Sequence, residues 1–479
     1  MKIRKILMVE PKAPADHVYS IIRMPRLGLP ILGTLASRRG IDVRIVIEDI
    51  VAVDFDQVRD ADLLCISTIT STAPGAYRLA DRARAAGVPV VIGGPHVTFM
   101  PDEALGHADW VMRGEAERSF GPFLDMLEQR AGPQDVPGLS CRLDGETVHN
   151  PLAPDRVDMD SVPIPDFSLM SSKKKGKFDR GVVPIQTSRG CPHHCNFCSV
   201  TPMFGHKLRF ASAEHVAEEL ESRRGMGDGV FFYDDNFCAS PARSKVLLDH
   251  LMSHDVFLPP WLAQVSVRAA RDLELLQMMQ RSGCHTVFVG FESVNPDTLA
   301  LYDKRQNLED IRLAIRRFRQ HDIWVHGMFV IGSDADGIET IRATSRFALK
   351  EGIDTIQFLV LTPLPGTPFM EDMERQGRLL SRDWSLYDAH HCVFRPALMS
   401  PNEMMSETMS AMRRVYSPGR ILGLAARGKF RRFFFNLYAR RQVKNWQKAN
   451  SRKLRETEWA ESVVNPPLGA SPSTGSGLK

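Results

Sequence analysis

The sequence predicts an α/β protein: a doubly wound, Rossmann-like N-terminal domain, then a partial (β/α)6 barrel of the TIM type, then a helical C-terminal region. Short apolar runs alternate with amphipathic segments over residues 1–130, and again with a longer period from Val182 onwards. Such alternation indicates parallel sheets covered by helices. The chain has 479 residues, too many for one core. We expect the Rossmann-like domain at 1–135, a connector with a hairpin at 136–181, the barrel at 182–395, basic helices at 396–460 and a disordered tail at 461–479.

The first domain is expected to bind a ligand at one edge of its sheet. Predicted strands cover 2–10, 41–49, 61–68 and 88–94, with helices at 27–40 and 75–87. Ligands in doubly wound sheets bind beyond the carboxyl ends of the strands. The loops there, 10–17, 67–75 and 93–101, are rich in Gly, Pro, Ser and Thr, so their backbone can approach a ligand closely. Further along, Asp144-Gly145 predicts the turn of a hairpin.

The barrel is predicted from six strand–helix units. Expected strands lie at 182–188, 229–235, 261–266, 285–292, 323–332 and 353–360, and expected helices at 212–224, 241–254, 272–283, 308–321 and 337–352. In barrels of this type the active site lies at the carboxyl ends of the strands.

Three cysteines with the spacing C-x3-C-x2-C directly follow the first barrel strand. They are Cys191, Cys195 and Cys198. Three thiolates are too few to close a tetrahedral zinc site, unless His193, His194 or a distant cysteine is the fourth ligand. An iron–sulfur cubane can use three thiolates and leave one iron open. The other five cysteines have no partner at ligand spacing and are expected to be buried apolar residues.

This motif, with Phe197 as its aromatic residue, resembles the signature of the radical S-adenosylmethionine (SAM) superfamily. The resemblance implies a [4Fe-4S] cluster whose open iron chelates SAM. Reduced by an external donor such as flavodoxin or ferredoxin, the cluster would cleave SAM to methionine and a 5′-deoxyadenosyl radical. The positions that match the family's SAM contacts are Phe197, Asp234, Asp235 and Asn236 (amine), Ser266 and Arg268 (carboxylate), Glu292 and Ser293 (ribose or carboxylate), and Val330, Ile331 and Gly332 (adenine).

The order of the domains resembles the cobalamin-binding radical SAM subclass over residues 1 to about 420. PRLGLPILGTLA, GGPHVTFMPDEAL, ADWVMRGEAE and TPLPGTPF are typical of it. VFRPALMSP and the barrel strands look closest to the branch with the anaerobic magnesium-protoporphyrin ester cyclase and the hopanoid methylases. The cobalamin contacts that this resemblance implies are Pro11, Ser67, Thr68, Ser71, Thr72, Gly93, Gly94, Pro95, His96, Val97, Arg113, Gly114 and Glu115.

One departure concerns the cobalt ligand. Many cobalamin domains carry D-x-H-x-x-G, but here Asp16 and His17 are adjacent and lack the glycine. The lower axial site is therefore expected to be empty, water-filled or served by another residue.

The resemblance implies methylation of an unactivated carbon in a hydrophobic metabolite, such as a lipid or a tetrapyrrole. The alternatives are a cobalamin-dependent radical oxidative cyclisation or rearrangement, or a radical SAM enzyme whose cobalamin-like domain has no cofactor. A protein of a different class is also considered: an RNA-binding or structural iron–sulfur protein that catalyses no reaction. In that case the matches of YDDN and GFES to the family's SAM contacts would be accidental.

The C-terminal region is strongly basic. Between Thr408 and Arg455 there are fourteen Lys and Arg residues and no acidic one. Aromatic side chains such as Phe434 and Trp446 are interleaved with them. Three interpretations are open for this segment. It is expected to be a helix docked on the barrel, or a helix that lies on an anionic membrane surface. Its charge alone would also suit a nucleic-acid contact, but no nucleic-acid-binding module is recognised.

No apolar run approaches the ~20 residues of a membrane span. The N-terminus reads as a strand, not a signal peptide. We expect a cytoplasmic protein, with peripheral contact to the inner face of the membrane as the alternative. Clustered cysteines in this compartment point to metal or redox chemistry.

Overall fold

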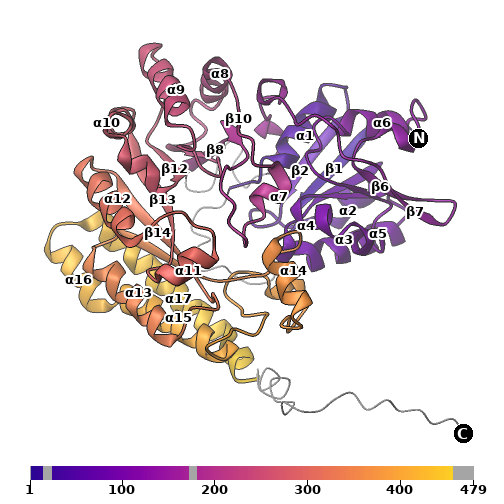
Figure 1. The fold of residues 1–479 in the computed structure, drawn as a ribbon. Helices are drawn as coiled ribbons and strands as arrows, with labels where there is room; N and C mark the ends of the chain where they lie inside the picture. The colour runs from indigo at the N-terminus through magenta and orange to yellow at the C-terminus, as the bar shows by residue number, and fades with distance from the viewer. Residues whose placement is uncertain (1, 14–23, 172–180, 457–479) are drawn as a thin grey trace, which may run out of the picture.

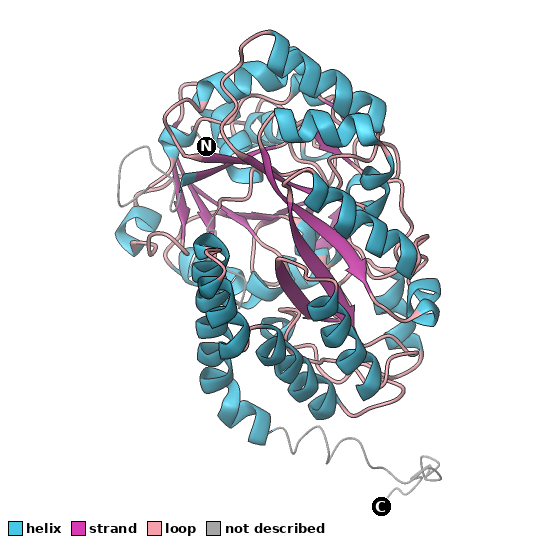
Figure 2. Cartoon of the chain, turned by 90° about the vertical axis from the view of Figure 1, so that its left-hand side faces the viewer, coloured by secondary structure: helices cyan, strands magenta, loops and turns pink. Residues whose placement is uncertain are grey.

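The computed structural model describes residues 2–13, 24–171 and 181–456. Two sheet-containing domains lie side by side, and the C-terminal helices pack against the second (Figure 1). Seen at right angles, the strands of both sheets lie inside a shell of helices (Figure 2). Among the described residues, no helix is both long and apolar enough to cross a membrane.

The first domain has a seven-stranded sheet in the order β2-β1-β3-β4-β5-β6-β7. The parallel strands are β1 Lys5–Glu10, β2 Asp42–Ile47, β3 Leu63–Ser67, β4 Val90–Gly93 and β5 Trp110–Met112. Side chains of β1 alternate between two cores, with Ile6 and Met8 on one face and Leu7 and Val9 on the other. Helices on both faces cover these cores: α1 Gly28–Ser37 and α6 Phe120–Leu127 on one, and α3 Ala73–Ala85 on the other. Shorter helices are α2 Phe55–Arg59, α4 Pro95–Phe99 and α5 Pro101–Leu105.

The predicted hairpin exists, but it belongs to this sheet and not to a connector. Strands β6 Leu139–Leu143 and β7 Glu146–His149 turn at Asp144 and Gly145, and β6 pairs antiparallel with β5. The sheet therefore runs past residue 135, where the sequence suggested a boundary. The physical reason is that β5 would otherwise leave an unpaired edge, which the hairpin covers.

The second domain has six parallel strands in the order β15-β14-β13-β12-β11-β8, as the sequence predicts. They are β8 Val182–Ile185, β11 Gly229–Phe232, β12 Trp261–Val265, β13 Cys284–Glu292, β14 Trp324–Ile331 and β15 Thr355–Val360. The covering helices are α8 Ala213–Ser222, α9 Pro241–Ser253, α10 Leu273–Arg281, α12 Leu308–Gln320 and α13 Ile338–Lys350. Two short helices, α7 Val200–Phe204 and α11 Pro296–Leu301, and a small ribbon of β9 Ser188–Arg189 with β10 Arg209–Phe210 complete it.

After the barrel, the chain returns to the first domain. Helix α14 Pro368–Arg375 and the turn Trp384–Leu386 lie beside it (Figure 1). Met370, Trp384 and Val393 are part of the core under α3. The indole Nε1 of Trp384 donates a hydrogen bond to Glu103 Oε1 at 2.8 Å. The two domains are therefore joined by packing as well as by the chain between them.

Three helices close the described chain: α15 Pro401–Val415, α16 Pro418–Ala426 and α17 Phe430–Glu456. Helix α15 packs on α13 and β15, and its Met404 and Met412 are fully buried. The expected disordered tail, 461–479, lies outside the described residues.

Candidate functional site

The three cysteines lie on one loop between β9 and α7. Cys191, Cys195 and Cys198 are all free and half-buried. The amide of Cys198 donates to the carbonyl of Cys195 at 3.1 Å, and that of Cys191 to Gly205 at 3.3 Å, so a turn and α7 hold the loop. Burial raises the pKa of each thiol, to about 12 for Cys198. A metal or a neighbouring cation would therefore be needed to lower these pKa values and deprotonate the thiols.

Lys304 supplies a positive charge beside this loop, and sequence reasoning missed it. Its Nζ donates to Glu292 Oε1 at 2.7 Å, and the two side chains are 14% and 9% exposed. Burial lowers the pKa of Lys304, but Glu292 and Cys195 outweigh burial, so the pKa is raised and the side chain stays charged. The same cation, after burial, lowers the pKa of His193 to about 4. No spacing in the sequence relates Lys304 to the cysteines.

The donor set fits an iron–sulfur cluster with one open iron. Three thiols come from a single short loop, and a buried lysine offsets their negative charge once they ionise. Among the described residues, no three Cys, His, Asp or Glu side chains already form a metal-binding group. In a cubane each thiolate binds a different iron, so the three cysteines need not converge on a single ion. The remaining cysteines, Cys65, Cys141, Cys238, Cys284 and Cys392, are buried as expected.

The three polar residues after β11 do different things. Asp234 is fully buried, and its carboxylate accepts from the amides of Thr187 and Ser188, both at 2.7 Å, and from Thr187 Oγ1 at 2.6 Å. It holds the strand that leads into the cysteine loop, and both of its carboxylate oxygens already accept hydrogen bonds; a SAM contact by Asp234 stays a prediction. Asn236 is also used internally, since its Oδ1 accepts from the amide of Ser266 at 3.2 Å.

Asp235 is the member of the group that faces a cavity. Its buried Oδ2 has no hydrogen-bond partner. Burial, and then Asp234, raise its pKa to about 7. Its charge also raises the pKa of Cys191 and Cys198, so it lies close to the cysteine loop. An unpartnered acceptor at this position fits the ammonium group of an amino acid.

The remaining candidates for SAM contacts are placed as follows. Glu292, at a bulge between β13 and β14, has a φ of 59°. Ser293 is fully buried, and its Oγ accepts from the amide of Asn295. Arg268 is exposed, Val330 and Ile331 are buried, and Phe197 meets Tyr302 edge-on with 4.8 Å between ring centroids. Gly332 has a φ of 121°, which L side chains rarely adopt, and a Cβ there would stand 2.8 Å from Met404 Sδ of α15.

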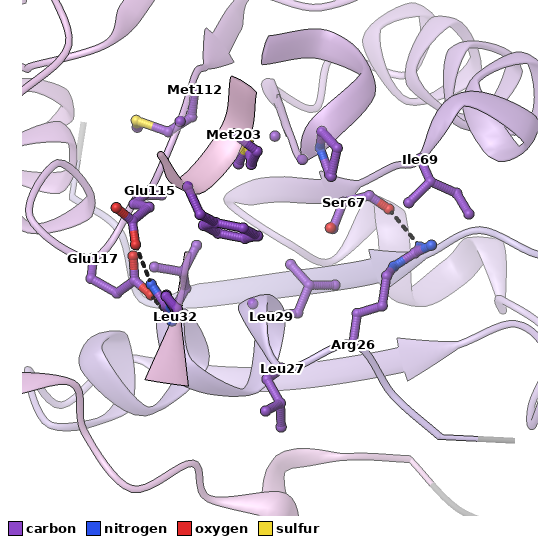
Figure 3. A pocket seen from close by; sticks show the side chains of 18 of the residues that line it. Arg26, Leu27, Leu29, Leu32, Ser67, Ile69, Met112, Glu115, Glu117 and Met203 are labelled. Atoms are coloured by element: carbon purple, nitrogen blue, oxygen red, sulfur yellow. Dashed lines mark hydrogen bonds and ion pairs between the residues drawn. The ribbon is translucent and has the colours of Figure 1, made fainter. Parts of the chain in front are cut away.

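A large cavity separates the two domains at the carboxyl ends of both sheets. The space inside it, including the part open to solvent, is about 1580 Å³. The first domain contributes loops after β3, β4 and β5 and the start of α1, and the barrel contributes Gln186, Tyr233, Asp235 and Gln264. Figure 3 shows Leu29, Met112 and Met203 along this cavity, with Glu115 and Glu117 at one end and Arg26 and Ser67 at the other.

Part of the expected cobalamin set lines this cavity: Ser67, Gly93, Gly94, Pro95, Gly114 and Glu115. Gly94 has a φ of 108°, and a Cβ there would stand 2.4 Å from the Thr68 carbonyl oxygen, so only glycine allows this turn. The rest of the set, Pro11, Thr68, Ser71, Thr72, His96, Val97 and Arg113, is absent from its lining. Thr68 and Thr72 instead bind each other through their hydroxyl groups at 2.7 Å.

His96 points away from the cavity, into the contact between the domains. Its Nε2 lies 3.1 Å from the hydroxyl of Tyr77 and 3.6 Å from Glu103 Oε1, and its ring meets Trp384 edge-on. This histidine is a packing residue. Sequence reasoning also missed most of the apolar lining, including Leu29, Leu32, Met112 and Met203. The stretch PRLGLPILG is the signal that points to the α1 part of this wall.

A buried ionic cluster ties the cavity wall to the cysteine loop. Arg189, two residues before Cys191, binds Glu115 Oε1 at 2.8 Å and Glu117 Oε1 at 2.6 Å. Arg209 binds the same Glu115 oxygen at 2.9 Å. All four side chains are at most 12% exposed. We call Glu115, Glu117, Arg189 and Arg209 the interdomain latch, because the glutamates come from the first domain and the arginines from the barrel.

The inner face of the barrel is aromatic and carries neutral polar groups. Phe288, His326 and Gln357 are half-buried, whereas the residues beside them on each strand are fully buried. The rings of Phe288 and His326 are 4.7 Å apart. Burial lowers the pKa of His326 to about 4, so its ring is neutral and its Nε2 donates to Gln357 Oε1 at 3.2 Å. Such a surface suits a mainly apolar ligand.

Two family models match the chain: a B12 binding domain over residues 22–123 and the radical SAM superfamily over 185–348. A bacteriochlorophyllide d C-12(1)-methyltransferase of Chlorobaculum tepidum is 30% identical over 430 residues, covering 88% of this chain and 89% of that protein. The chain belongs to the cobalamin-dependent radical SAM methyltransferases. Its cofactors are a [4Fe-4S] cluster, SAM and cobalamin, as the sequence resemblance implied.

Other relatives of this methyltransferase belong to the expected branch. The hopanoid C-2 methylase of Rhodopseudomonas palustris is 28% identical, covering 79% of this chain and 72% of that protein. The anaerobic magnesium-protoporphyrin IX monomethyl ester cyclase of Cereibacter sphaeroides is 28% identical, covering 68% and 55%. The fold is shared with TsrM of Kitasatospora setae, a radical SAM methyltransferase solved with cobalamin and a [4Fe-4S] cluster (TM-score 0.66, 19% identity, 78% of this chain and 75% of that chain).

Proposed function

We propose that this methyltransferase adds a methyl group to an unactivated carbon of a hydrophobic, ring-containing small molecule, a tetrapyrrole or a polycyclic lipid. The observation that carries the proposal is the shared cavity. Loops of the cobalamin-binding domain form one wall, and Asp235, next to the cysteine loop, stands in the other. A substrate in this space would be reached from both domains.

One group of residues would bind the iron–sulfur cluster and SAM, and a second group would bind cobalamin. Cys191, Cys195 and Cys198 would hold the cluster, Lys304 the carboxylate of SAM and Asp235 its amino group. The backbone around Gly93-Gly94 and the apolar wall from α1 would hold cobalamin. When bound, the cluster supplies the electron that cleaves SAM, and cobalamin carries the methyl group.

The chain's own contribution is positioning and the exclusion of water. Lys304 and Glu292 are buried and paired, so they are already ordered before a ligand arrives. The apolar lining from α1 and α7 keeps water away from a reactive carbon radical. The aromatic inner face with Phe288 and neutral His326 favours a substrate that is mainly apolar. The two relatives named as methylating bacteriochlorophyllide and hopanoid support this substrate class.

The test is product analysis after anaerobic reconstitution with iron, sulfide and hydroxocobalamin. Tetrapyrroles and triterpenoids are supplied with SAM and a reductant, flavodoxin or ferredoxin or a chemical donor. Methylation predicts S-adenosylhomocysteine and 5′-deoxyadenosine in equal amounts, with a methylated product labelled by methyl-deuterated SAM. Deoxyadenosine without homocysteine products, from every substrate, would contradict the proposal.

A radical oxidative cyclase is the second candidate, and the similarity to the protoporphyrin ester cyclase favours it. The two candidates differ in their use of SAM. A cyclase consumes SAM only for the radical, so its product carries no deuterium from labelled methyl groups. The same assay therefore separates the two reactions.

A further inference from the structure

The junction of α16 and α17 exposes large apolar side chains. Leu422, Phe430, Phe434, Phe435 and Leu437 are 65%, 60%, 65%, 41% and 46% exposed. Single exposed apolar residues are ordinary, but five within sixteen residues at one helix junction are more than scattered exposure. We call these five residues the α16–α17 corner. Docking of the C-terminal region on the barrel does not explain them.

The two faces of α17 have different roles. Asn436, Val443 and Trp446 are at most 3% exposed, and the neighbouring Arg432 binds Asp354 Oδ1 at 2.8 Å. This face holds the helix on the barrel. Phe430, Phe434 and Leu437 follow the spacing i, i+4, i+7, which puts them together on the opposite face. The apolar patch is therefore held outward by a well-anchored helix.

The corner is surrounded by positive charge. Arg427, Lys429, Arg431, Arg441 and Lys444 are exposed, and none of them forms an ion pair among the residues that the structure describes. No acidic residue occurs between Thr408 and Arg455. Apolar side chains ringed by unpaired cations match the two layers of an anionic bilayer surface, with its acyl boundary and its negative headgroups.

We propose that the α16–α17 corner docks this enzyme on an anionic lipid bilayer. The side chains of Phe430, Phe434 and Leu437 enter the acyl boundary, and the surrounding Lys and Arg residues bind headgroups. Aliphatic Leu422 and Leu437 give nothing to stacking on nucleic-acid bases, so lipid accounts for the patch better than nucleic acid. This inference does not depend on which substrate is methylated.

The position of the corner is compatible with catalysis. Helix α16 lies at the end of the molecule away from the first domain (Figure 1). Arg432 lies over the ring of Trp324, 5.0 Å from its centroid, and Trp324 begins β14, so the corner is near the amino ends of the barrel strands. The cavity lies at their carboxyl ends. A docked enzyme would keep its cavity uncovered.

The test is co-sedimentation of the reconstituted enzyme with phosphatidylcholine vesicles, with and without phosphatidylserine. The wild type should bind the anionic vesicles and lose binding as ionic strength rises. F430S/F434S/L437S and R427E/K429E/R431E should each bind about tenfold less tightly or worse. V246S/L273S, which removes apolar side chains that are 66% and 49% exposed elsewhere, is the matched control and should bind like the wild type.

All substituted side chains are exposed, so each variant should keep the thermal midpoint of the wild type and its rate of SAM cleavage. The proposal is overturned if the wild type ignores phosphatidylserine, or if the corner variants bind like the control. It is also overturned if the phenylalanine variant changes only the oligomeric state in gel filtration, since a second copy would then be the occupant. The proposal is likewise overturned if the wild type binds RNA but not the vesicles, since the α16–α17 corner would then be a nucleic-acid contact.

Discussion

At the residue scale, Lys304 and Glu292 carry the largest expected energies. Both are nearly buried, and each is the other's partner at 2.7 Å. Removing one member of such a pair leaves the other charge uncompensated, which costs about 3–5 kcal/mol. We expect Lys304→Met to lower the free energy of unfolding by that amount, measured by urea denaturation of the apoprotein.

The double variant separates structure from ligand binding. E292Q/K304M should recover most of the lost stability, because neither buried charge remains. It should still fail to bind SAM, measured by equilibrium dialysis, if Lys304 receives the carboxylate. The matched control is Lys245→Met, whose partners Glu274 at 2.6 Å and Asp272 at 3.2 Å are 71% and 26% exposed, so its loss should cost less than about 1 kcal/mol. Wild-type affinity for SAM in the double variant would contradict the assigned role.

Asp235 predicts a pH dependence. Its folded pKa is raised to about 7, above the ordinary 3.8, so the folded state binds the proton more tightly than the unfolded state. Stability contributed by this group is present below pH 4 and is lost as the pH rises through about 7. Asp235→Asn should therefore stabilise the apoprotein at pH 8, on the order of 4 kcal/mol, and make little difference at pH 4. Urea denaturation at the two pH values checks this, and an equal gain at both would contradict the raised pKa.

At the element scale, the interdomain latch connects the loop after β5 to the strand that enters the cysteine loop. Glu115 serves Arg189 and Arg209 together. Glu115→Gln keeps the shape but removes the charge, and it should lower the free energy of unfolding by about 3 kcal/mol. It should also raise the ratio of deoxyadenosine to methylated product. The two walls of the cavity would no longer be held in a fixed relative position, so SAM cleavage would less often lead to methyl transfer.

The control for this latch is Asp60→Asn, which breaks the exposed pair of Lys5 and Asp60 and should change neither quantity. A Glu115→Gln enzyme that is destabilised but keeps the wild-type product ratio would show that the latch is structural only. Arg189→Lys, which keeps one charge but not the forked contact with both glutamates, should give an intermediate ratio.

The sequence predicts this element arrangement better than it predicts the contacts between elements. The barrel strands and the cysteine motif follow from local periodicity and spacing, and the six-stranded order agrees. Three features cannot be predicted from local sequence: the position of Lys304, the interdomain latch, and the orientation of His96 toward the contact between the domains. Each depends on partners far along the chain. Trp384 and Glu103, for example, are 281 residues apart. Asp234 and Asp235 are neighbours with opposite roles, which only burial distinguishes.

At the scale of the whole molecule, the cavity makes the two domains one binding unit. Its walls include Leu29 and Leu32 from the first domain and Met203 and Phe204 from the barrel. A ligand that binds only the folded form at a hundred times its Kd stabilises that form by about 2.7 kcal/mol. When the ligand contacts both walls, this stabilisation reaches both domains.

Hydroxocobalamin should therefore slow amide hydrogen exchange in α1 and in α7 together. We expect this protection of α7 even if cobalamin does not contact α7 directly. Arg189 and Arg209 flank α7 and are bound by Glu115 of the first domain, so the interdomain latch connects α7 to that domain. Peptides from α10 and α12, on the outer side of the barrel, serve as the internal reference and should be unchanged. Protection confined to α1 would mean that cobalamin touches one wall only. In that case the methyl carrier and the cysteine loop would be held by separate surfaces, and domain closure would have to precede methyl transfer.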